Sequence, residues 1–336
     1  MPHSPDPNSL VDLCPAVKAF AGRRVLIWGD FVADRFLHGS TTRVSREAPA
    51  LVLRHESEEV RPGCAGNAAL NAAALGAEVI ACGFVGKDDV GNALQGALAA
   101  AGINVDNIRQ RPDGETPVKT RVMAGGRHTT RQQILRIDNE TPWRQDEACS
   151  GIANALKAMA MDVDAVMISD YGLGTVCSAA AREWLASRPE IPVVLDSRHR
   201  LLEFPGVTAA TPNESEAEEA VRQPFANDMS AVEEAGAQIT EQLGCEHLLI
   251  TRGSHGMAVF SGTETPVHLP IHGTHEIADV TGAGDTVLAS FTLGLAAGNA
   301  ALPAARVANI AASLAVLKYG TATVTTAELL AALDCE

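Results

Sequence analysis

Short apolar runs alternate with longer Ala-rich segments along most of the chain. The runs predicted as buried strands cover residues 25–28, 79–84, 165–169, 193–196 and 247–251. The segments with helical spacing of apolar residues cover 65–75, 89–101, 147–159, 179–187, 231–243, 283–297 and 304–318. Buried strands that alternate with helices are typical of βαβ units. The pattern therefore predicts an α/β fold with a doubly wound, mostly parallel sheet flanked by helices.

Two segments, 36–60 and 118–137, do not follow this pattern. The second shows strand-like alternation on both sides of a Gly125-Gly126 turn. We expect the two segments to pair as a small antiparallel β-sheet and to form a lid over the strand ends. No internal repeat or low-complexity linker divides the chain, so residues 21–336 are predicted as one domain after an N-terminal extension of residues 1–20.

Composition narrows the function more than the fold. The chain has 336 residues, of which 46% are hydrophobic and 20% charged, which suffices for a large core. Its formal net charge of −15 argues against a nucleic-acid partner, because phosphate backbones are held mainly by Lys and Arg. A small phosphate ligand is still compatible, since backbone N–H groups at a helix N-terminus can hold it.

Seven cysteines are scattered without Cys-x-x-Cys spacing, so we expect buried, reduced thiols and neither a zinc site nor a disulfide framework. The first residues lack a basic stretch followed by an apolar run, and no apolar run reaches membrane-spanning length. A cytoplasmic location without a membrane partner is therefore expected.

The loop from Asp279 to Asp285 carries the clearest chemistry. Gly282-Ala283-Gly284 forms a turn of small residues directly before a long apolar helix, which leaves free N–H groups for an anion hole. Asp285 then lies in the first helical turn, where its carboxylate would accept the proton of an attacking hydroxyl. The alternative is that Asp279 and Asp285 are only favourable charges at a helix N-terminus, each contributing about 0.3 to 1 kcal/mol.

The stretch Asp279-Val280-Thr281-Gly282-Ala283-Gly284-Asp285-Thr286 resembles the C-terminal signature of the ribokinase-like (PfkB) carbohydrate kinases. Gly63-Cys64-Ala65-Gly66-Asn67 resembles the glycine-rich N-terminal motif of the same family. The resemblance extends over residues 23–325 and implies ATP-dependent phosphorylation of a sugar hydroxyl, with Asp285 as catalytic base.

Within this family the chain is most similar to kinases that phosphorylate D-glycero-D-manno-heptose 7-phosphate at its anomeric hydroxyl, on the route to ADP-heptose for lipopolysaccharide. The stretches that carry this likeness are 29–35, 42–49, 61–63, 119–122 and 132–138. The most specific of them is Glu47-Ala48-Pro49. The resemblance also implies a homodimer joined through the lid.

The resemblance implies individual roles as well. ATP would be bound by Asn213, Glu216, Thr251, Gly253, Gly256 and Asn309. Glu216 would hold Mg²⁺ through water, and Asp279 with the Thr281 carbonyl would hold a monovalent cation such as K⁺. The sugar would be bound by Asp34, Gly63, Asn67 and Arg136.

Local alternatives exist for several of these residues. Asn213 and Glu216 have the spacing of a helix capping box, which needs no ligand. Gly253 and Gly256 flank a predicted hairpin turn, and Asn309 is also compatible with an ordinary polar position on a helix. Asp34 follows the first buried strand, near the sheet edge at which α/β proteins bind ligands.

The chain departs from the heptose kinases at three places. Leu173 stands where a lysine is usual, Ser197-Arg198 replaces Pro-Lys, and Cys64 replaces a glycine. A kinase for another sugar, sugar phosphate or nucleoside is therefore an open alternative. Arginines in the lid segments favour an anionic substrate if they face the pocket: Arg43, Arg121, Arg131 and Arg136.

Two further alternatives belong to other classes. A non-catalytic sugar- or nucleotide-binding relative would retain the fold, but the intact Gly282-Ala283-Gly284 turn and Asp285 argue against it. A Rossmann dehydrogenase would need Gly-x-Gly-x-x-Gly after its first strand, and residues 29–34 do not supply it.

Overall fold

The computed structural model describes residues 13–125, 132–144, 151–152, 156, 158–186, 190–226, 228–273 and 278–335. Its main body is built on a nine-stranded sheet of order β13-β12-β11-β10-β9-β8-β1-β4-β5. The strands are β1 (Arg24–Gly29), β4 (Glu78–Gly86), β5 (Asn104–Arg111), β8 (Ala165–Asp170), β9 (Val193–Ser197), β10 (Ala209–Ala210), β11 (His247–Thr251), β12 (Met257–Ser261) and β13 (Val267–Leu269). From β5 to β11 neighbouring strands are parallel, and β12 and β13 add antiparallel pairs at one edge.

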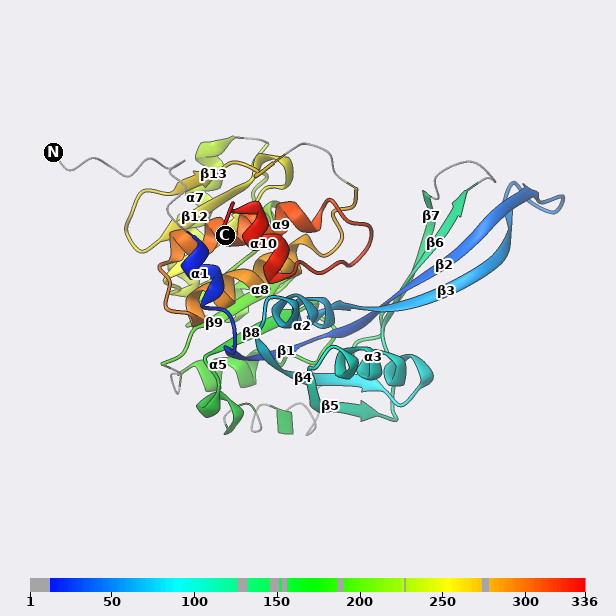
Figure 1. Cartoon of the computed structure of the whole chain (residues 1–336), viewed down its shortest axis with the longest axis horizontal. Helices are drawn as coiled ribbons and strands as arrows, with labels where there is room; N and C mark the ends of the chain where they lie inside the picture. The colour runs from blue at the N-terminus through cyan, green and yellow to red at the C-terminus, as the bar shows by residue number, and fades with distance from the viewer. Residues whose placement is uncertain are drawn as a thin grey trace.

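Helices cover both faces of this sheet (Figure 1). They are α1 (Cys14–Lys18), α2 (Ala65–Ala74), α3 (Asp89–Ala100), α5 (Ser178–Ala186), α6 (Glu214–Val221), α7 (Met229–Leu243), α8 (Ala283–Ala296), α9 (Ala301–Ala315) and α10 (Thr326–Ala332), with short 3₁₀ turns η1 (Ala160–Asp162), η2 (Leu201–Glu203) and η3 (Gly253–His255). One apolar core lies under α2, α3, α8 and α9, and a second lies under α5, α6 and α7. The predicted doubly wound α/β fold is therefore confirmed.

Helix α8 is the element that places the main site residue. Its side chains are buried without interruption from Asp285 to Gly294, so it has no solvent-facing stripe. It packs against α2 and α9, and at Gly294 the Ala304 methyl approaches so closely that a side chain would not fit. This close packing fixes the N-terminus of α8 relative to the strand ends.

A second sheet projects from the main body as an arm (Figure 1). It has the order β3-β2-β6-β7 and consists of β2 (Phe31–Val44), β3 (Leu51–Cys64), β6 (Val118–Gly125) and β7 (Gln132–Asn139). The two predicted segments do pair, but the expected all-antiparallel arrangement is wrong, because β2 and β6 run parallel. The physical reason is that β2 follows β1 and β6 follows β5, and β1 and β5 both run parallel to β4. Both chain segments therefore leave the main sheet at the carboxyl ends of its strands and extend in the same direction. Residues 126–131, which include Gly126 and Arg131, lie outside the described residues.

The cysteine prediction was wrong for one pair. Cys14 and Cys335 form a disulfide with their Cα atoms 5.9 Å apart, because α1 and α10 pack side by side. Sequence spacing gives no hint of a contact across 321 positions. Cys64, Cys82 and Cys245 are buried free thiols, and Cys177 is a half-buried one.

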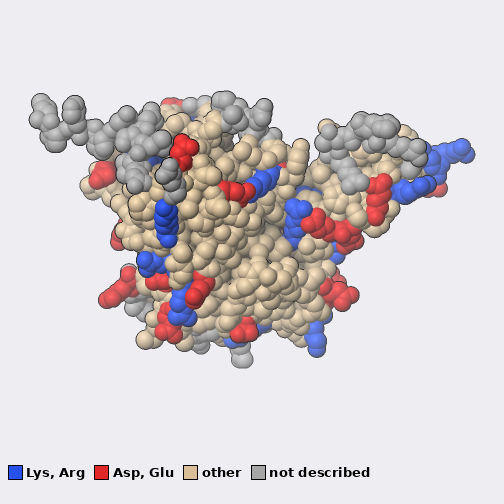
Figure 2. All heavy atoms as spheres, viewed as in Figure 1, with Lys and Arg blue, Asp and Glu red and all other residues tan. Residues whose placement is uncertain are grey.

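The predicted helix at 147–159 lies mostly outside the described residues. Among the helices in the described ranges, none is long and apolar enough to cross a membrane. On the face of the molecule seen in Figure 2, Lys and Arg side chains lie interspersed with Asp and Glu.

Candidate active site

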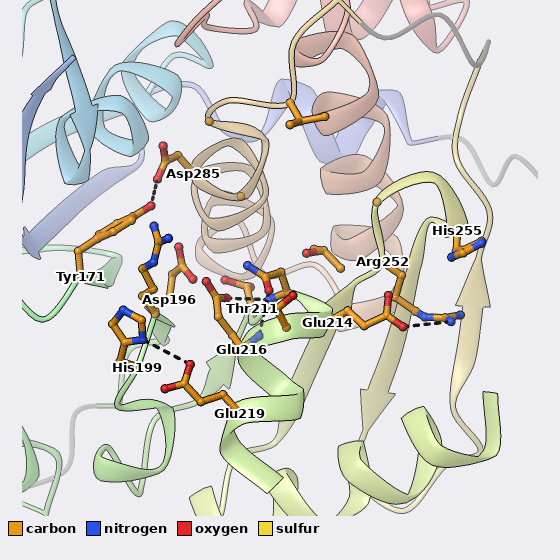
Figure 3. A pocket seen from close by; sticks show the side chains of 18 of the residues that line it. Tyr171, Asp196, His199, Thr211, Glu214, Glu216, Glu219, Arg252, His255 and Asp285 are labelled. Carbon is orange, nitrogen blue, oxygen red and sulfur yellow. Dashed lines mark hydrogen bonds and ion pairs between the residues drawn. The ribbon is translucent and has the colours of Figure 1, made fainter. Parts of the chain in front are cut away.

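Asp285 lies in the first turn of α8 with its side chain buried and both carboxylate oxygens hydrogen-bonded. The Asn67 amide nitrogen on α2 donates to Oδ2 at 2.7 Å. The Tyr171 hydroxyl, on the loop after β8, donates to Oδ1 at 3.2 Å (Figure 3). Three separate elements therefore fix the orientation of this carboxylate.

Burial raises the pKa of the Asp285 carboxyl to about 7, against the hydrogen bonds from Asn67 and Tyr171, which lower it. The negative charge of Asp34 adds to the increase and the positive charge of Lys119 opposes it. An ordinary aspartate is a weak base, whereas a carboxylate with a pKa near neutrality is suited to accept a proton at physiological pH.

Gly282 caps α8 in the left-handed conformation, with φ at +82°. A methyl group at this position would overlap the Asn67 amide that holds Asp285, so both the backbone and the contact require glycine. The neighbouring Gly284 faces open space, while the Ala283 N–H points back to the Val280 carbonyl at 3.3 Å. The predicted anion-hole residues therefore form the exposed N-terminus of α8.

Asp34 and Gly63 lie together at the base of the small sheet. The Asp34 carboxylate forms a buried ion pair with Arg121 of β6. A side chain at Gly63 would come within 2.5 Å of Asp34 Oδ2, so glycine is required beside this carboxylate. Lys119, also on β6, extends its ammonium to 3.0 Å from Glu140 and 3.6 Å from the Cys64 sulfur.

A cleft of about 820 Å³ begins at Asp285 and Tyr171 and runs along the carboxyl ends of the strands (Figure 3). Residues predicted to bind ATP lie along it, namely Asn213, Glu216, Thr251 and Gly253. Its far end carries Arg252, which pairs with Glu214 at 3.5 Å. The topology explains the cleft, because loops that follow parallel strands gather at one edge of the sheet.

Asn213 and Glu216 form a complete capping box at the start of α6. The Asn213 side chain accepts from the Glu216 N–H at 3.0 Å, and the Glu216 carboxylate accepts from the Asn213 N–H at 2.8 Å. Both side chains nevertheless line the cleft. The local alternative is thus confirmed, and it does not exclude a role in ligand binding.

Asp196 lies next to Glu216 in the cleft (Figure 3). Burial raises the pKa of Asp196 well above its ordinary value, and the nearby charges of Glu216, Asp285 and Asp170 raise it further. Burial also raises the pKa of Glu216, although the Asn213 hydrogen bond and Arg198 oppose the increase. The negative charges of Asp196 and Glu216 repel each other, and a cation bound between the two carboxylates would relieve this repulsion.

A narrower, mostly apolar slot of about 170 Å³ opens from the same region. It shares Thr251, Gly253 and Gly284 with the cleft and continues between α8 and α9 to Asn309 and Gly256. The Asn309 amide donates to the Pro270 carbonyl at 2.7 Å, which holds the loop above the slot. An apolar lining with a few polar groups is typical of sites that bind flat aromatic groups.

Arg136, Asp279 and Thr281 line a different cavity of about 880 Å³ between the small sheet and the C-terminal loops. Arg61 and Arg121 line it too. Asp279 accepts hydrogen bonds from the Thr281 N–H at 2.9 Å, the Thr281 hydroxyl at 2.7 Å and the Gly320 N–H at 3.0 Å. The pKa of Asp279 is lowered, because these hydrogen bonds outweigh the effect of burial.

The sequence interpretation missed Tyr171 and Asp196. Each lies at or directly after the carboxyl end of a predicted strand, and that position was the available signal. Lys119 was also missed, because its alternating strand context gives no indication that its side chain is buried.

A doubly wound sheet with a projecting second sheet, and a buried aspartate at a helix N-terminus beside a strand-end cleft, define an α/β enzyme of the small-molecule kinase class. The profile of the pfkB family carbohydrate kinases matches residues 25–328. The chain belongs to the pfkB family of carbohydrate kinases.

Individual relatives agree with this assignment. The chain is 40% identical over 321 residues to the bifunctional protein HldE of Trichlorobacter lovleyi, covering 93% of this chain and 63% of that protein. It is 40% identical over 319 residues to HldE of Caulobacter vibrioides, covering 94% of this chain and 64% of that protein. The chain therefore spans less than two thirds of the length of these curated relatives.

Solved structures show the same fold. A ribokinase of Arabidopsis thaliana, complexed with ribose and ATP, superposes with a TM-score of 0.74 at 20% identity, covering 94% of this chain and 100% of that one. Phosphofructokinase-2 of Escherichia coli, in complex with substrates and products, superposes with a TM-score of 0.72 at 17% identity, covering 93% of this chain and 98% of that one. The ribokinase-like fold prediction is confirmed.

Proposed function

We propose that this protein transfers a phosphoryl group from ATP to the anomeric hydroxyl of D-glycero-D-manno-heptose 7-phosphate, on the route to ADP-heptose. The observation that carries the proposal is the buried Asp285 at the N-terminus of α8, at one end of the strand-end cleft. The likeness to heptose 7-phosphate kinases, together with the relatives named HldE, supports the choice of sugar.

In this proposal Asp285 accepts the proton of the attacking hydroxyl. Its raised pKa supports that role, because the carboxylate gains basicity without leaving the physiological range. The backbone N–H groups of Gly282 and Gly284 would stabilise the charge that develops on the transferred group, aided by the dipole of α8. The Ala283 N–H, which donates to the Val280 carbonyl at 3.3 Å, would join them by giving up that contact. Asp34, Gly63 and Asn67 would hold the sugar hydroxyls.

The two connected cavities support ATP and Mg²⁺ as cofactors. The apolar slot at Asn309 and Gly256 suits an adenine, and Thr251 and Gly253 link it to the polar cleft. Glu216, with Asp196 beside it, would hold Mg²⁺ through water and supply charge neutralisation for the phosphates. Asp279 and the Thr281 carbonyl would hold K⁺, and stimulation of turnover by K⁺ over Na⁺ tests that part.

The cavity between the small sheet and the C-terminal loops supports an anionic substrate. Arg61, Arg121 and Arg136 line it, although each also has an acidic partner. A substrate phosphate would compete for these guanidinium groups, which bind phosphate in bidentate fashion. In this proposal the small sheet acts as a lid whose arginines recognise the phosphorylated end of the sugar, and the protein acts as a homodimer.

One observation favours a second candidate, a kinase for a different sugar phosphate. Leu173, which stands where the heptose kinases have lysine, is buried against Val32 and Cys64 and contributes no charge to the site. Arg198 still lines the cleft. The second candidate retains the same base and cofactors.

A coupled ADP-release assay over sugars, sugar phosphates and nucleosides tests the proposal. We expect turnover with heptose 7-phosphate. The Asp285→Asn variant should have no turnover, because the amide cannot accept the proton, but it should still bind ATP. Turnover with another sugar phosphate alone would favour the second candidate. Near-normal turnover in Asp285→Asn would exclude the proposed mechanism.

A further inference from the structure

The Asp285 carboxylate has a different donor for each oxygen. Asn67 donates to Oδ2 at 2.7 Å. Tyr171 donates to Oδ1 at 3.2 Å (Figure 3). A carboxylate held at one oxygen can still rotate about its last bond, whereas one held at both cannot without breaking a hydrogen bond. Tyr171 therefore completes the fixation of the group to which the proton is transferred.

The loop that carries Tyr171 is itself fixed by Asp30, a buried residue directly after β1. The Asp30 carboxylate accepts hydrogen bonds from the N–H groups of Tyr171 at 2.9 Å, Leu173 at 3.0 Å and Thr175 at 3.0 Å. Because β1 and β8 are neighbouring parallel strands, the aspartate after one strand reaches the loop after the other. The backbone of Tyr171 is thereby tied to the central part of the sheet.

The Tyr171 ring is fixed on its sides as well. The Lys119 ammonium lies 4.9 Å from the ring centroid and is held at 3.0 Å from Glu140. The ring also packs against the small apolar cluster of Val32, Cys64 and Leu173. The Lys119 cation over the ring and the apolar side chains packed against the ring leave it little freedom to turn away from Asp285.

We propose that Tyr171 is a positioning residue of the phosphotransfer reaction: its hydroxyl aims the Asp285 carboxylate at the acceptor hydroxyl, and Asp30 acts by holding Tyr171 in place. This inference rests on the proposed function, since it assumes that Asp285 is the base. It extends that function to two residues for which the sequence motifs gave no role.

The groups around Asp285 determine in which direction the pKa of Asp285 should change in the test. Titratable groups from several elements face it, namely Asp34 on β2, Cys64 on β3, Lys119 on β6 and Asp196 on β9. None of these changes when only the Tyr171 hydroxyl is removed. That hydroxyl lowers the pKa of Asp285, so its removal raises this pKa.

The test is the pH dependence of kcat/KM for Tyr171→Phe, which retains the ring and its contact with Lys119. In the wild type we expect the acid limb near pH 7, where Asp285 ionises. In the variant the acid limb should move up by roughly one unit, the size expected for the loss of a hydrogen bond to a charged group. At pH 6 this corresponds to a loss of about tenfold in kcat/KM.

Ser169→Ala is the matched control. It removes a buried hydroxyl from β8 that has no hydrogen-bond partner among the described residues, so its acid limb should stay at the wild-type position. An acid limb in Tyr171→Phe that coincides with the wild type overturns the proposal. So does an equal shift in Ser169→Ala, because the change would then reflect general loosening of the strand end.

Asp30→Asn tests the second half of the proposal. The amide replaces an acceptor oxygen with a donor, so the loop should loosen and the acid limb should move in the same direction. The double variant Asp30→Asn/Tyr171→Phe should then show little further shift, because both changes remove one interaction. Additive shifts would show that Asp30 does not act through Tyr171. Circular dichroism checks folding, and if Asp30→Asn is unfolded, Tyr171→Phe alone decides.

Failure of this inference can be told apart from failure of the proposed function. If Asp285→Asn retains turnover, the base is wrong and both fall. If Asp285→Asn is inactive and the acid limb of Tyr171→Phe does not move, only the role of Tyr171 is refuted.

Discussion

A single backbone position links the kinase signature to the geometry of the base. Gly282 combines a positive φ with close contact to the Asn67 amide, and Asn67 in turn holds Asp285. The glycine in this turn is thus required for two reasons that are separable by experiment. One is conformational strain, and the other is displacement of a neighbouring side chain.

Gly282→Ala should lower kcat by about 10²-fold, the size of effect expected when a catalytic group is misplaced by about 1 Å. Gly298→Ala is the control, since Gly298 has φ at +80° and open space around it. Both variants should lose roughly 1 kcal/mol of stability from the left-handed backbone. Only Gly282→Ala should lose activity, as measured by steady-state kinetics beside thermal unfolding. Equal kinetics in the two variants would show that Asn67 tolerates the displacement.

The residues of the site differ in whether their roles could be predicted from the sequence. Asp285, Asn67 and Asp34 follow from motifs, and the structure brings them to the strand ends as expected. Tyr171 and Asp196 could not be predicted from spacing, because their proximity to the site arises from neighbouring parallel strands that are distant in sequence. The buried position of Lys119 depends on how β2 and β6 pair.

At the scale of elements, two helices begin with the same device in different surroundings. Asn213 and Glu216 cap α6 inside the cleft, and Thr325 and Glu328 cap α10 away from it. The pKa of Glu216 is raised by burial, whereas that of Glu328 is lowered to about 2 by hydrogen bonds from Lys318 and Thr325. The capping box stabilises the helix in both cases. Only in α6 is the pKa of the capping glutamate raised, which means that its buried surroundings destabilise the charged form of Glu216.

This contrast yields a test of the metal site. Gln is accepted at the third position of a capping box, so Glu216→Gln should retain α6. It should raise the Mg²⁺ concentration needed for half-maximal turnover by about tenfold or more, because one anionic oxygen near the cation is lost. Glu328→Gln should leave the Mg²⁺ dependence unchanged. An unchanged Mg²⁺ requirement in Glu216→Gln would remove this residue from the metal site.

Elements buried on both sides were predicted best. The strands β1, β8, β9 and β11 appear as continuous apolar runs, and α8 as a long apolar helix. The edge strands β5 and β13 were missed, because one is rich in polar residues and the other is short. The mixed pairing of the small sheet was missed because alternation predicts a strand but not its partner or direction.

At the scale of the whole molecule, the arm exposes apolar side chains that a monomer would leave in water. Ile134, Leu135 and Ile137 of β7 are 41%, 54% and 54% exposed. This supports the proposed homodimer through the small sheet. Leu135→Asp should convert the dimer to a monomer in sedimentation equilibrium. Met161→Asp, at a residue 85% exposed on the main body, should remain a dimer. A monomeric wild type would refute the dimer.

The disulfide between Cys14 and Cys335 ties α1 to α10 and so closes almost the entire chain into a loop. A crosslink of this span restricts the unfolded chain strongly, and its removal should lower the free energy of unfolding by about 2 to 5 kcal/mol. Urea unfolding of Cys14→Ser should show this loss, and wild type treated with dithiothreitol should match the variant. Cys177→Ser, which removes a free thiol, should unfold like the untreated wild type. Neither cysteine is among the residues proposed for the kinase site, so kcat should be unchanged in folded Cys14→Ser. If dithiothreitol leaves the wild-type unfolding curve unchanged, the two thiols are not crosslinked in solution.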